Sequence, residues 1–284
     1  MKNECIKVIG LLLLSLSHSI TAQEADSEEG ESYPAPDILN VPFFEEGGPK
    51  HLSVHVMKGG ITVIAHEKND VRIEAVGRYK KHRKSPPEKD GLKLIQGRGS
   101  SGVYAEVKDN KMEVGVENWK YAVDLTLLVP REISLDLNSV NDGNIVVRGI
   151  TGEMEIECIN GSIEVYEAKG AVLAHALNRD VKVELLEVYP EKSMSFTSMN
   201  GDIDVTLPQA IQANVKLDTF TGDILSDFEI EIDENHSKPV VEGSDKKGRY
   251  RIGFDKAIYG SLNGGGELYR FETHNGDIMI RKAK

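Results

Sequence analysis

Aspartates recur at one position of a repeated motif, and regularly spaced carboxylates are candidate ligands for a metal ion. Asp180, Asp202, Asp223 and Asp277 each directly precede an isoleucine or valine, and Ser162 occupies the same position in one repeat. If the repeats stack at the usual strand spacing of about 4.8 Å, these carboxylates repel one another unless something offsets their charge. Calcium, which prefers hard oxygen ligands, would do so. Hydrogen bonds from backbone N–H groups at each aspartate's own corner, or exposure to water, would suffice without a metal.

Two other features argue against a metal or cofactor site. The glycine-aspartate nonapeptide typical of calcium-binding β-rolls does not occur in the sequence. His51 and His55 are four positions apart, which places them about 13 Å apart along a strand, too far to share one ion. His66, His175 and His274 occur singly and are interpreted as structural. The sequence therefore predicts neither a metal site nor a cofactor site.

One pair of carboxylates raises the question of catalysis. Asp202 and Asp204 are two positions apart, so on a strand they project from the same face. Glycoside hydrolases use two carboxylates about 5 to 9.5 Å apart, one of them with a raised pKa. Almost any alternating strand offers such a pair, so the spacing alone predicts no catalytic residue. A β-helical polysaccharide lyase or hydrolase remains the alternative function.

The elements that position these side chains are short strands joined by a polar-glycine corner. Four segments place an isoleucine seven positions after a large apolar residue, with the corner between them: Ile156/Ile163, Phe196/Ile203, Leu217/Ile224 and Phe271/Ile278. Repetition of this kind is typical of coils that bury their apolar sides against one another. The chain is therefore predicted to be all-β, a β-helix or β-solenoid of stacked 18–22-residue coils with an N-terminal β-strand region.

The corner residues Ile145, Ile163, Val181, Ile203 and Ile224 follow one another at the coil spacing, whereas Ile278 comes 54 residues after Ile224. That gap hides either degenerate coils or an excursion from the stack, for which the polar segment Glu229–Gly248 is suited. Val54 and Ile61 flank Gly59-Gly60 with the motif's spacing, which indicates an early coil.

Side-chain parity changes at each corner. Phe196 and Ser198 are expected to face inward before the corner, and Ile203, Val205 and Leu207 after it, so the chain must turn between them. Asn-Gly at 160–161, 200–201 and 275–276 suits a turn with positive φ. Asp142-Gly143 is displaced by one residue and is interpreted as a bulge. Antiparallel hairpins would produce the same parity change, but the recurring columns favour coils.

Two polar columns are expected beside the aspartates. At the corner stand Asn160, Asn178, Asn200, Thr221 and Asn275. Stacked asparagines form amide ladders. After the inward residue come Glu164, Lys182 and Asp204, which alternate in sign and favour neighbouring ion pairs.

The N-terminus has the features of a secretory signal peptide, assigned to residues 1–22. Lys2 and Lys7 precede an apolar run, Val8–Leu16, that is too short to span a bilayer. Residues 23–49, rich in Glu, Gly, Ser and Pro, are interpreted as a disordered acidic linker, and residues 50–284 as the β-helix-like domain. The only cysteine after residue 22 is Cys158, predicted to be a core residue. The expected location is the periplasm, the outer-membrane surface or the extracellular space.

Charge narrows the range of partners. The chain has 46 acidic and 34 basic residues and a net charge of −12. Nucleic acid and anionic lipid are therefore unsuitable partners, and no transmembrane segment is expected after signal cleavage. The basic run Arg78–Lys84 is interpreted as a solvated loop, with contact to envelope glycans as its functional alternative. Envelope glycans and surface proteins are the candidate partners.

Several motifs resemble those of the bacterial exported adhesin-type domains of unknown function. The residues are Leu125–Pro130, Gly201-Asp202-Ile203, Gly222-Asp223-Ile224, Asn263–Gly266 and Thr273–Ile278, within a likeness that covers residues 50–284. The resemblance implies a β-helix-like stack and an adhesive or scaffolding role at the envelope, without enzymatic activity. The chain departs from the pattern at Asn178-Arg179-Asp180, where arginine replaces the corner glycine and a wider or distorted coil is expected. A stress-linked envelope factor with a protein partner is a third possible role.

Overall fold

A computed structural model describes residues 35–43, 47–78, 101–117, 121–234, 239–242, 251–254 and 257–284. Within these ranges the chain consists of strands and turns, and it has no helix with the length and apolar character needed to cross a bilayer. The described residues belong to one unit, Ser32–Lys284. The predicted signal peptide 1–22 lies outside the described residues, as do residues 79–84 of the basic run.

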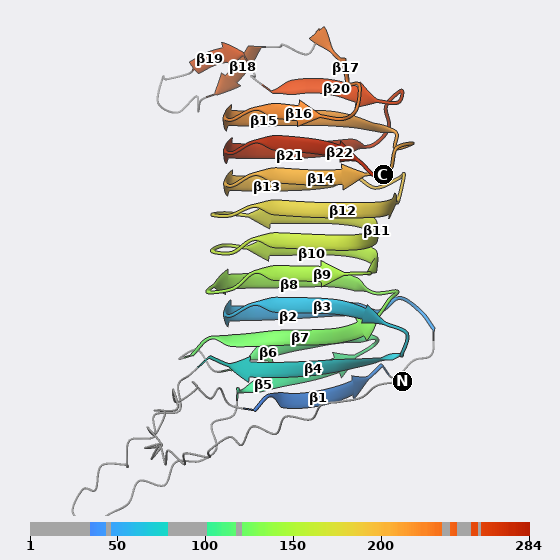
Figure 1. Cartoon of the computed structure of the whole chain (residues 1–284), viewed down its shortest axis with the longest axis vertical. Helices are drawn as coiled ribbons and strands as arrows, with labels where there is room; N and C mark the ends of the chain where they lie inside the picture. Colours follow the sequence, from blue (N-terminus) through green and yellow to red (C-terminus); the bar gives the residue numbers. More distant parts are fainter. Residues whose placement is uncertain are drawn as a thin grey trace, which may run out of the picture. The chain divides into compact units, whose positions relative to one another are not determined.

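Most strands form two rows of parallel pairs (Figure 1). Row A contains β6 (Lys111–Val116), β2 (His51–Lys58), β8 (Ser134–Asn141), β10 (Thr151–Cys158), β13 (Met194–Asn200), β21 (Leu268–Asn275) and β15 (Ala213–Thr221). Row B contains β7 (Val123–Pro130), β3 (Ile61–His66), β9 (Ile145–Arg148), β12 (Val181–Val188), β14 (Ile203–Leu207), β22 (Ile278–Lys282) and β16 (Ile224–Ser226). β11 (Ile163–Ala176) contributes its first half to row B and its second half to row A. The fold is all-β and solenoid-like.

The predicted column of corner residues is confirmed by the strand register. Ile163 pairs with Ile145 on one side and with Val181 on the other, and Val181 pairs with Ile203. Ile61 pairs with Ile145, so the early coil also belongs to the set. The predicted parallel arrangement therefore holds through the stack, and antiparallel hairpins do not account for it.

The order of the coils differs from the order of the sequence at one place. Ile203 pairs with Ile278, and Ile278 pairs in turn with Ile224. The final coil, β21–β22, therefore lies between β13–β14 and β15–β16, as Figure 1 shows. The expectation that successive corners lie one above another is wrong at this point. The 54-residue gap is the path by which the chain leaves β16 and returns to an interior position.

Antiparallel strands flank the parallel stack. β4 (Asp70–Gly77) pairs with β7, β1 (Asp37–Pro42) with β4, and β5 (Val103–Lys108) with β6. β20 (Ile258–Leu262) pairs with β15, and β17 (Glu231–Ile232) with β20. β18 (Pro239–Glu242) and β19 (Arg251–Phe254) pair with each other. These pairings satisfy main-chain groups that bare edges would expose.

Two predicted irregular segments contain strands. The prediction that residues 23–49 are a disordered linker is wrong for Asp37–Pro42, which forms β1 because Leu39 and Val41 pack against the core while the backbone pairs with β4. Within the predicted excursion Glu229–Gly248, β17 adds to the row-A sheet through β20. Residues 235–238 and 243–250 of that segment lie outside the described residues.

The core consists of the inward residues of both rows. Ile203, Val205 and Leu207 are fully buried, as predicted, and the rings of Phe196 and Phe271 lie 5.1 Å apart in adjacent coils. Burial of each such side chain contributes about 1.5 to 3 kcal/mol to stability. Cys158 is buried, which confirms its interpretation as a core residue, and burial raises the pKa of its thiol to about 11.

Candidate functional site

An asparagine ladder runs along the corners of five coils. Each side-chain amide nitrogen donates to the side-chain oxygen of the next coil: Asn160 to Asn141 at 2.7 Å, Asn178 to Asn160 at 2.7 Å, Asn200 to Asn178 at 3.2 Å and Asn275 to Asn200 at 2.8 Å. Thr221 occupies the next position, opposite Asn275. The predicted amide ladder is confirmed, with Asn141 as an additional member.

The aspartate column is a second ladder. Oδ1 of Asp180 accepts the backbone N–H of Asp202 at 2.9 Å, Oδ1 of Asp202 accepts that of Asp277 at 2.8 Å, and Oδ1 of Asp277 accepts that of Asp223 at 2.8 Å. The carboxylates of Asp180, Asp202 and Asp277 thus bind the neighbouring coil, so the expectation of bonds within their own corners is wrong for these three. In the described part of the chain, no group of three or more His, Cys, Asp or Glu side chains has a metal-binding arrangement.

The column formed by Glu164, Lys182 and Asp204 has the predicted register, but its bonded partners differ from those expected. Glu164 lies opposite Lys182, and Lys182 opposite Asp204. Arg281 Nε donates to Asp204 at 2.7 Å, however, and the Tyr166 hydroxyl donates to Glu164 at 2.8 Å. The bond to Glu164 raises the pKa of Tyr166, because it favours the protonated phenol. The first contact joins the neighbouring strands β22 and β14, and the second lies within β11.

The carboxylate pair considered for glycoside hydrolysis has structural partners. Asp202 accepts a backbone N–H from the next coil, and Asp204 forms an ion pair with Arg281. Both carboxylates therefore hold neighbouring coils together.

Close approach between coils explains the corner glycines. A Cβ atom on Gly161 would lie 2.0 Å from the carbonyl oxygen of Gly143, and one on Gly276 would lie 2.2 Å from that of Gly201. Gly161 and Gly201 do not have the positive φ that was expected of them. Glycine is required at 161 and 201 because an added Cβ would collide with the adjacent backbone, which lies 2.0 Å away at Gly143 O and 2.4 Å away at Arg179 C. The turn itself does not require glycine at these two positions.

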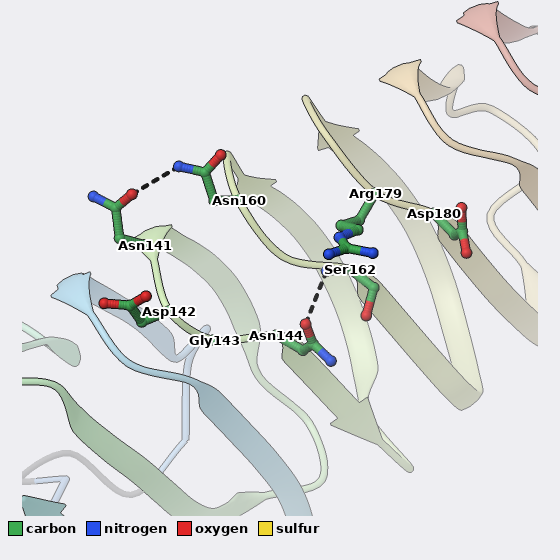
Figure 2. Close-up of a pocket in the computed structure, with 8 residues that line it drawn as sticks. All are labelled: Asn141, Asp142, Gly143, Asn144, Asn160, Ser162, Arg179 and Asp180. Atoms are coloured by element: carbon green, nitrogen blue, oxygen red, sulfur yellow. Dashed lines mark hydrogen bonds between the residues drawn. The ribbon is translucent and has the colours of Figure 1, made fainter. Parts of the chain in front are cut away.

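A polar hollow of about 750 Å³ opens beside three of these corners (Figure 2). Its lining residues are Asn141, Asp142, Gly143, Asn144, Asn160, Ser162, Arg179 and Asp180. Two residues, Asp142 and Gly143, separate Asn141 from Asn144, where Gly161 alone separates Asn160 from Ser162. Asp142 has a φ of +63°, which confirms the predicted bulge.

Arg179 lies in this hollow at the position where other coils have glycine. Its guanidinium extends toward Ser162 (Figure 2), and among the described residues it has no hydrogen-bond or ion-pair partner. At the corner the register is kept, because Val181 pairs with Ile163 and Ile203 and Asn178 remains in the ladder. Further along the same coil the expected distortion is present, since the β11–β12 pairing shifts register between Val165 and Lys169. The hollow thus combines a planar cation with amide, hydroxyl and carboxylate groups, which suits hydrogen bonding to hydroxyl and carboxylate groups of a ligand.

Each of the three single histidines contacts a neighbouring residue. His66 Nε2 lies 2.7 Å from the carbonyl oxygen of Asp70, and His175 Nδ1 lies 2.6 Å from the hydroxyl of Thr197. The ring of His274 stacks on Phe220 with centroids 4.7 Å apart.

The sequence profile of the Toastrack DUF4097 family matches residues 131–281, more than half of the chain. The chain belongs to this family. The match begins just before β8 and includes the asparagine ladder, the aspartate ladder and the hollow. No curated protein matches the sequence.

Three solved structures share similarity with this Toastrack protein. A candidate cell adhesion protein from Clostridium sporogenes is 13% identical, with a TM-score of 0.42, and the alignment covers 87% of this chain and 100% of that one. A candidate adhesin from Bacteroides fragilis is 10% identical, with a TM-score of 0.35 and coverage of 87% and 97%. A candidate adhesin from Parabacteroides merdae is 11% identical, with a TM-score of 0.28 and coverage of 88% and 97%.

Two features of the Toastrack stack were missed in the sequence. Arg281, the partner of Asp204, lies 77 positions away, and no local pattern links the two. Phe220 is 68% exposed directly before the corner residue Thr221. Aligning the residues that precede each corner asparagine would have revealed Phe220 as one member of an apolar column.

Proposed function

We propose that this Toastrack protein is a non-enzymatic protein, exported to the cell envelope or surface, with an adhesive or scaffolding role. The observation that carries the proposal is that its regularly spaced polar side chains form hydrogen bonds between neighbouring coils. Asp180, Asp202 and Asp277 hold coil to coil through their carboxylates, and the corner asparagines do so through their amides. Groups that resemble a reactive array are thus part of a rigid support.

A parallel β-helix built on Gly-Asp-Ile corners is the detailed architecture that we propose for this support. Such a stack suits adhesion because it orders side chains at intervals of about 4.8 Å without the need to reorganise on binding. Rigid presentation lowers the entropic cost of contact with an extended ligand. It also suits a spacer that holds another part of the envelope at a fixed distance.

Export follows in this proposal from the N-terminal features Lys2, Lys7 and Val8–Leu16. The test is cell fractionation with N-terminal sequencing of the protein recovered. A mature chain beginning near Gln23 in the periplasm, on the outer-membrane surface or in the medium is expected. Full-length protein retained in the cytoplasm would contradict export.

We propose that the ligand is an envelope glycan bearing carboxylates, held by Arg179 in the corner hollow. Arginine pairs with carboxylates through two parallel hydrogen bonds, and Asn144 and Ser162 line the same space. The test measures binding of the full-length chain to neutral and acidic envelope glycans. Binding should be confined to acidic glycans and fall at least about tenfold in Arg179→Ala, which corresponds to 1.4 kcal/mol.

Arg131→Ala is the matched control, because Arg131 is also exposed but pairs with Glu67 away from the hollow. It should bind as the unchanged protein does. Equal losses in the two variants would point to nonspecific charge attraction. New reducing ends or unsaturated products in the same incubations would contradict the non-enzymatic role.

A further inference from the structure

One outward column of row A is apolar in six of seven coils, with His274 as the exception. The strand registers align Met57 with Val140, Val140 with Ile159, and so on along the row. The full set, termed the apolar stripe, is Met57, Val140, Ile159, Leu177, Met199, His274 and Phe220. Backbone bonds at its centre support this register, since Leu177 N donates to Cys158 O and Asn200 N donates to Leu177 O. Each member directly precedes a corner position.

The apolar stripe is unusually exposed. Met57 is 62% exposed, Ile159 37%, Met199 49% and Phe220 68%. Six steps between seven coils at about 4.8 Å give the stripe a length of about 29 Å. Isolated exposed apolar side chains are ordinary, but a continuous row of this length typically marks an interaction surface.

A second outward column of the same row carries a gradient of charge. Toward the β6 end it contains Glu113, Ser53, Asp136 and Glu155, at its centre Leu173 and Ser195, and toward the β15 end Arg270 and Lys216. This column, termed the charged column, thus changes from acidic to basic along the stack. A surface of this kind is complementary to itself when reversed.

We propose that the apolar stripe and the charged column form the contact with a second copy of this chain. A two-fold axis along the strand direction brings row A against row A, reverses the coil order and keeps each column opposite itself. With the axis between β11 and β13, Leu177 lies opposite Met199 of the second copy. The same operation places Glu155 opposite Arg270 and Asp136 opposite Lys216. The interface is therefore isologous, with apolar side chains along one side and opposite charges along the other.

The size of row A is sufficient for a stable dimer. Across this axis six coils, from β8 to β15, face one another, so four outward columns about 6.8 Å apart and a length of about 24 Å give an area of about 650 Å² on each copy. This lies within the range of about 600 to 1,000 Å² per partner that is usual for a stable interface. The one like-charged pair, Glu157 opposite Glu272, is offset because Glu272 lies 2.7 Å from Lys216 and 3.3 Å from Arg270.

A second copy fits these features better than a glycan does. Sugar rings stack on aromatic faces, whereas five of the seven stripe members are aliphatic or methionine side chains. A neutral polymer also has no charges that could pair with the acidic and basic ends of the charged column. Reversal of an identical surface accounts for the stripe and the gradient together.

The test is sedimentation equilibrium of the full-length chain and of matched variants. The unchanged chain is expected to form dimers at concentrations of about 10 µM. Met199→Glu should sediment as a monomer at that concentration. Leu225→Glu is the control, because Leu225 is 54% exposed on β16 in row B, and it should still dimerise. Circular dichroism establishes that both variants are folded.

Charge reversal tests the proposed orientation. Glu155→Arg should weaken dimerisation at least about tenfold by placing two cations opposite each other. The double variant Glu155→Arg with Arg270→Glu should restore most of the affinity. A chain that remains monomeric at about 100 µM, or dimers that persist in Met199→Glu, would overturn the proposal. Equal affinity of the single and double charge variants would also overturn it, as would a monomer whose stripe binds a glycan.

Discussion

The backbone N–H of Asp277 donates to Oδ1 of Asp202 at 2.8 Å, across 75 positions of the sequence. This bond places the last coil in the interior of the stack. β21 pairs with β13 on one side and β15 on the other, and β22 pairs with β14 and β16. The C-terminal residues therefore hold together two parts of the core that precede them in the chain.

Removal of residues 268–284 should abolish cooperative folding. The truncation takes away β21 and β22, so β13–β14 and β15–β16 lose their shared neighbours and Phe196 loses its contact with Phe271. The expected loss exceeds about 5 kcal/mol, comparable to the whole stability of a domain. Thermal unfolding followed by circular dichroism measures it. Removal of Lys284 alone should leave the transition unchanged, and a sharp transition in the long truncation would contradict the interior position.

Asn178→Ala should destabilise the protein by about 1 to 2 kcal/mol. The substitution removes two ladder bonds, one to Asn160 and one from Asn200, each worth about 0.5 to 1.5 kcal/mol. Urea unfolding gives the free energy. Asn138→Ala is the matched control, because its amide makes one bond, to Glu157, and a smaller loss is expected. Equal losses of unfolding free energy in the two variants would show that the two ladder bonds of Asn178 contribute no more than the single bond of Asn138.

Substitutions at Asp202 should distinguish a hydrogen-bonding role from a metal-binding one. Asp202→Ala removes the acceptor for Asp277 N and should cost about 1 to 2 kcal/mol, whereas Asp202→Asn keeps an oxygen there and should cost less. The melting temperature should be the same in calcium and in chelator. A rise with calcium that disappears in both variants would show that the column binds the ion.

Gly161→Ala should cost more than about 3 kcal/mol. Its Cβ would lie 2.0 Å from the carbonyl oxygen of Gly143, so the two coils must separate. Gly264→Ala serves for comparison: its φ is +91°, but no atom lies within 4 Å of the added Cβ. Only conformational strain of about 1 to 2 kcal/mol is expected there. Denaturant unfolding that ranked the two variants in the opposite order would refute the role assigned to close approach.

The Cys158 thiol should make stability fall at alkaline pH. Burial raises its pKa to about 11, whereas the thiol of the unfolded chain ionises near about 8.5. The unfolded state therefore loses its proton first, so the stabilising contribution is complete below about pH 8.5 and is lost as pH rises toward about 11. The unfolding free energy of Cys158→Ala should fall less steeply over this interval. Equal slopes, or rapid reaction of the native thiol with a disulfide reagent at pH 8, would contradict the burial.

The sequence predicted much of the local structure because the motif repeats. Asn160, Asn178 and Asn200 follow similar short strands at similar spacing, and coils in register must bring like residues together. The ladders and inward faces follow from that repetition. The bulge at Asp142 was also readable, since one additional residue shifts the corner relative to Leu137.

The remaining features depend on relationships that no repeat encodes. The position of β21–β22 follows from strand pairing across the 54-residue gap between Ile224 and Ile278. The spacing of the corners along the sequence does not specify the order in which the coils stack. Leu39 and Val41 join the core through β4, although they lie in a short apolar segment within a stretch that is otherwise rich in Glu, Gly, Ser and Pro. Arg179 changes the surface of the hollow while the register at its own corner is kept, because a corner side chain can project outward without moving the strands.

The interior position of the final coil sets a limit on modular growth. A solenoid whose coils follow one another can gain or lose a unit at its end with little effect on the others. Here, duplication of the last unit would have to fit a new layer between two that already touch. Insertions are instead expected among the consecutive coils from Ile145 to Ile203, so variation in length should be concentrated there while the C-terminal third keeps a constant number of layers.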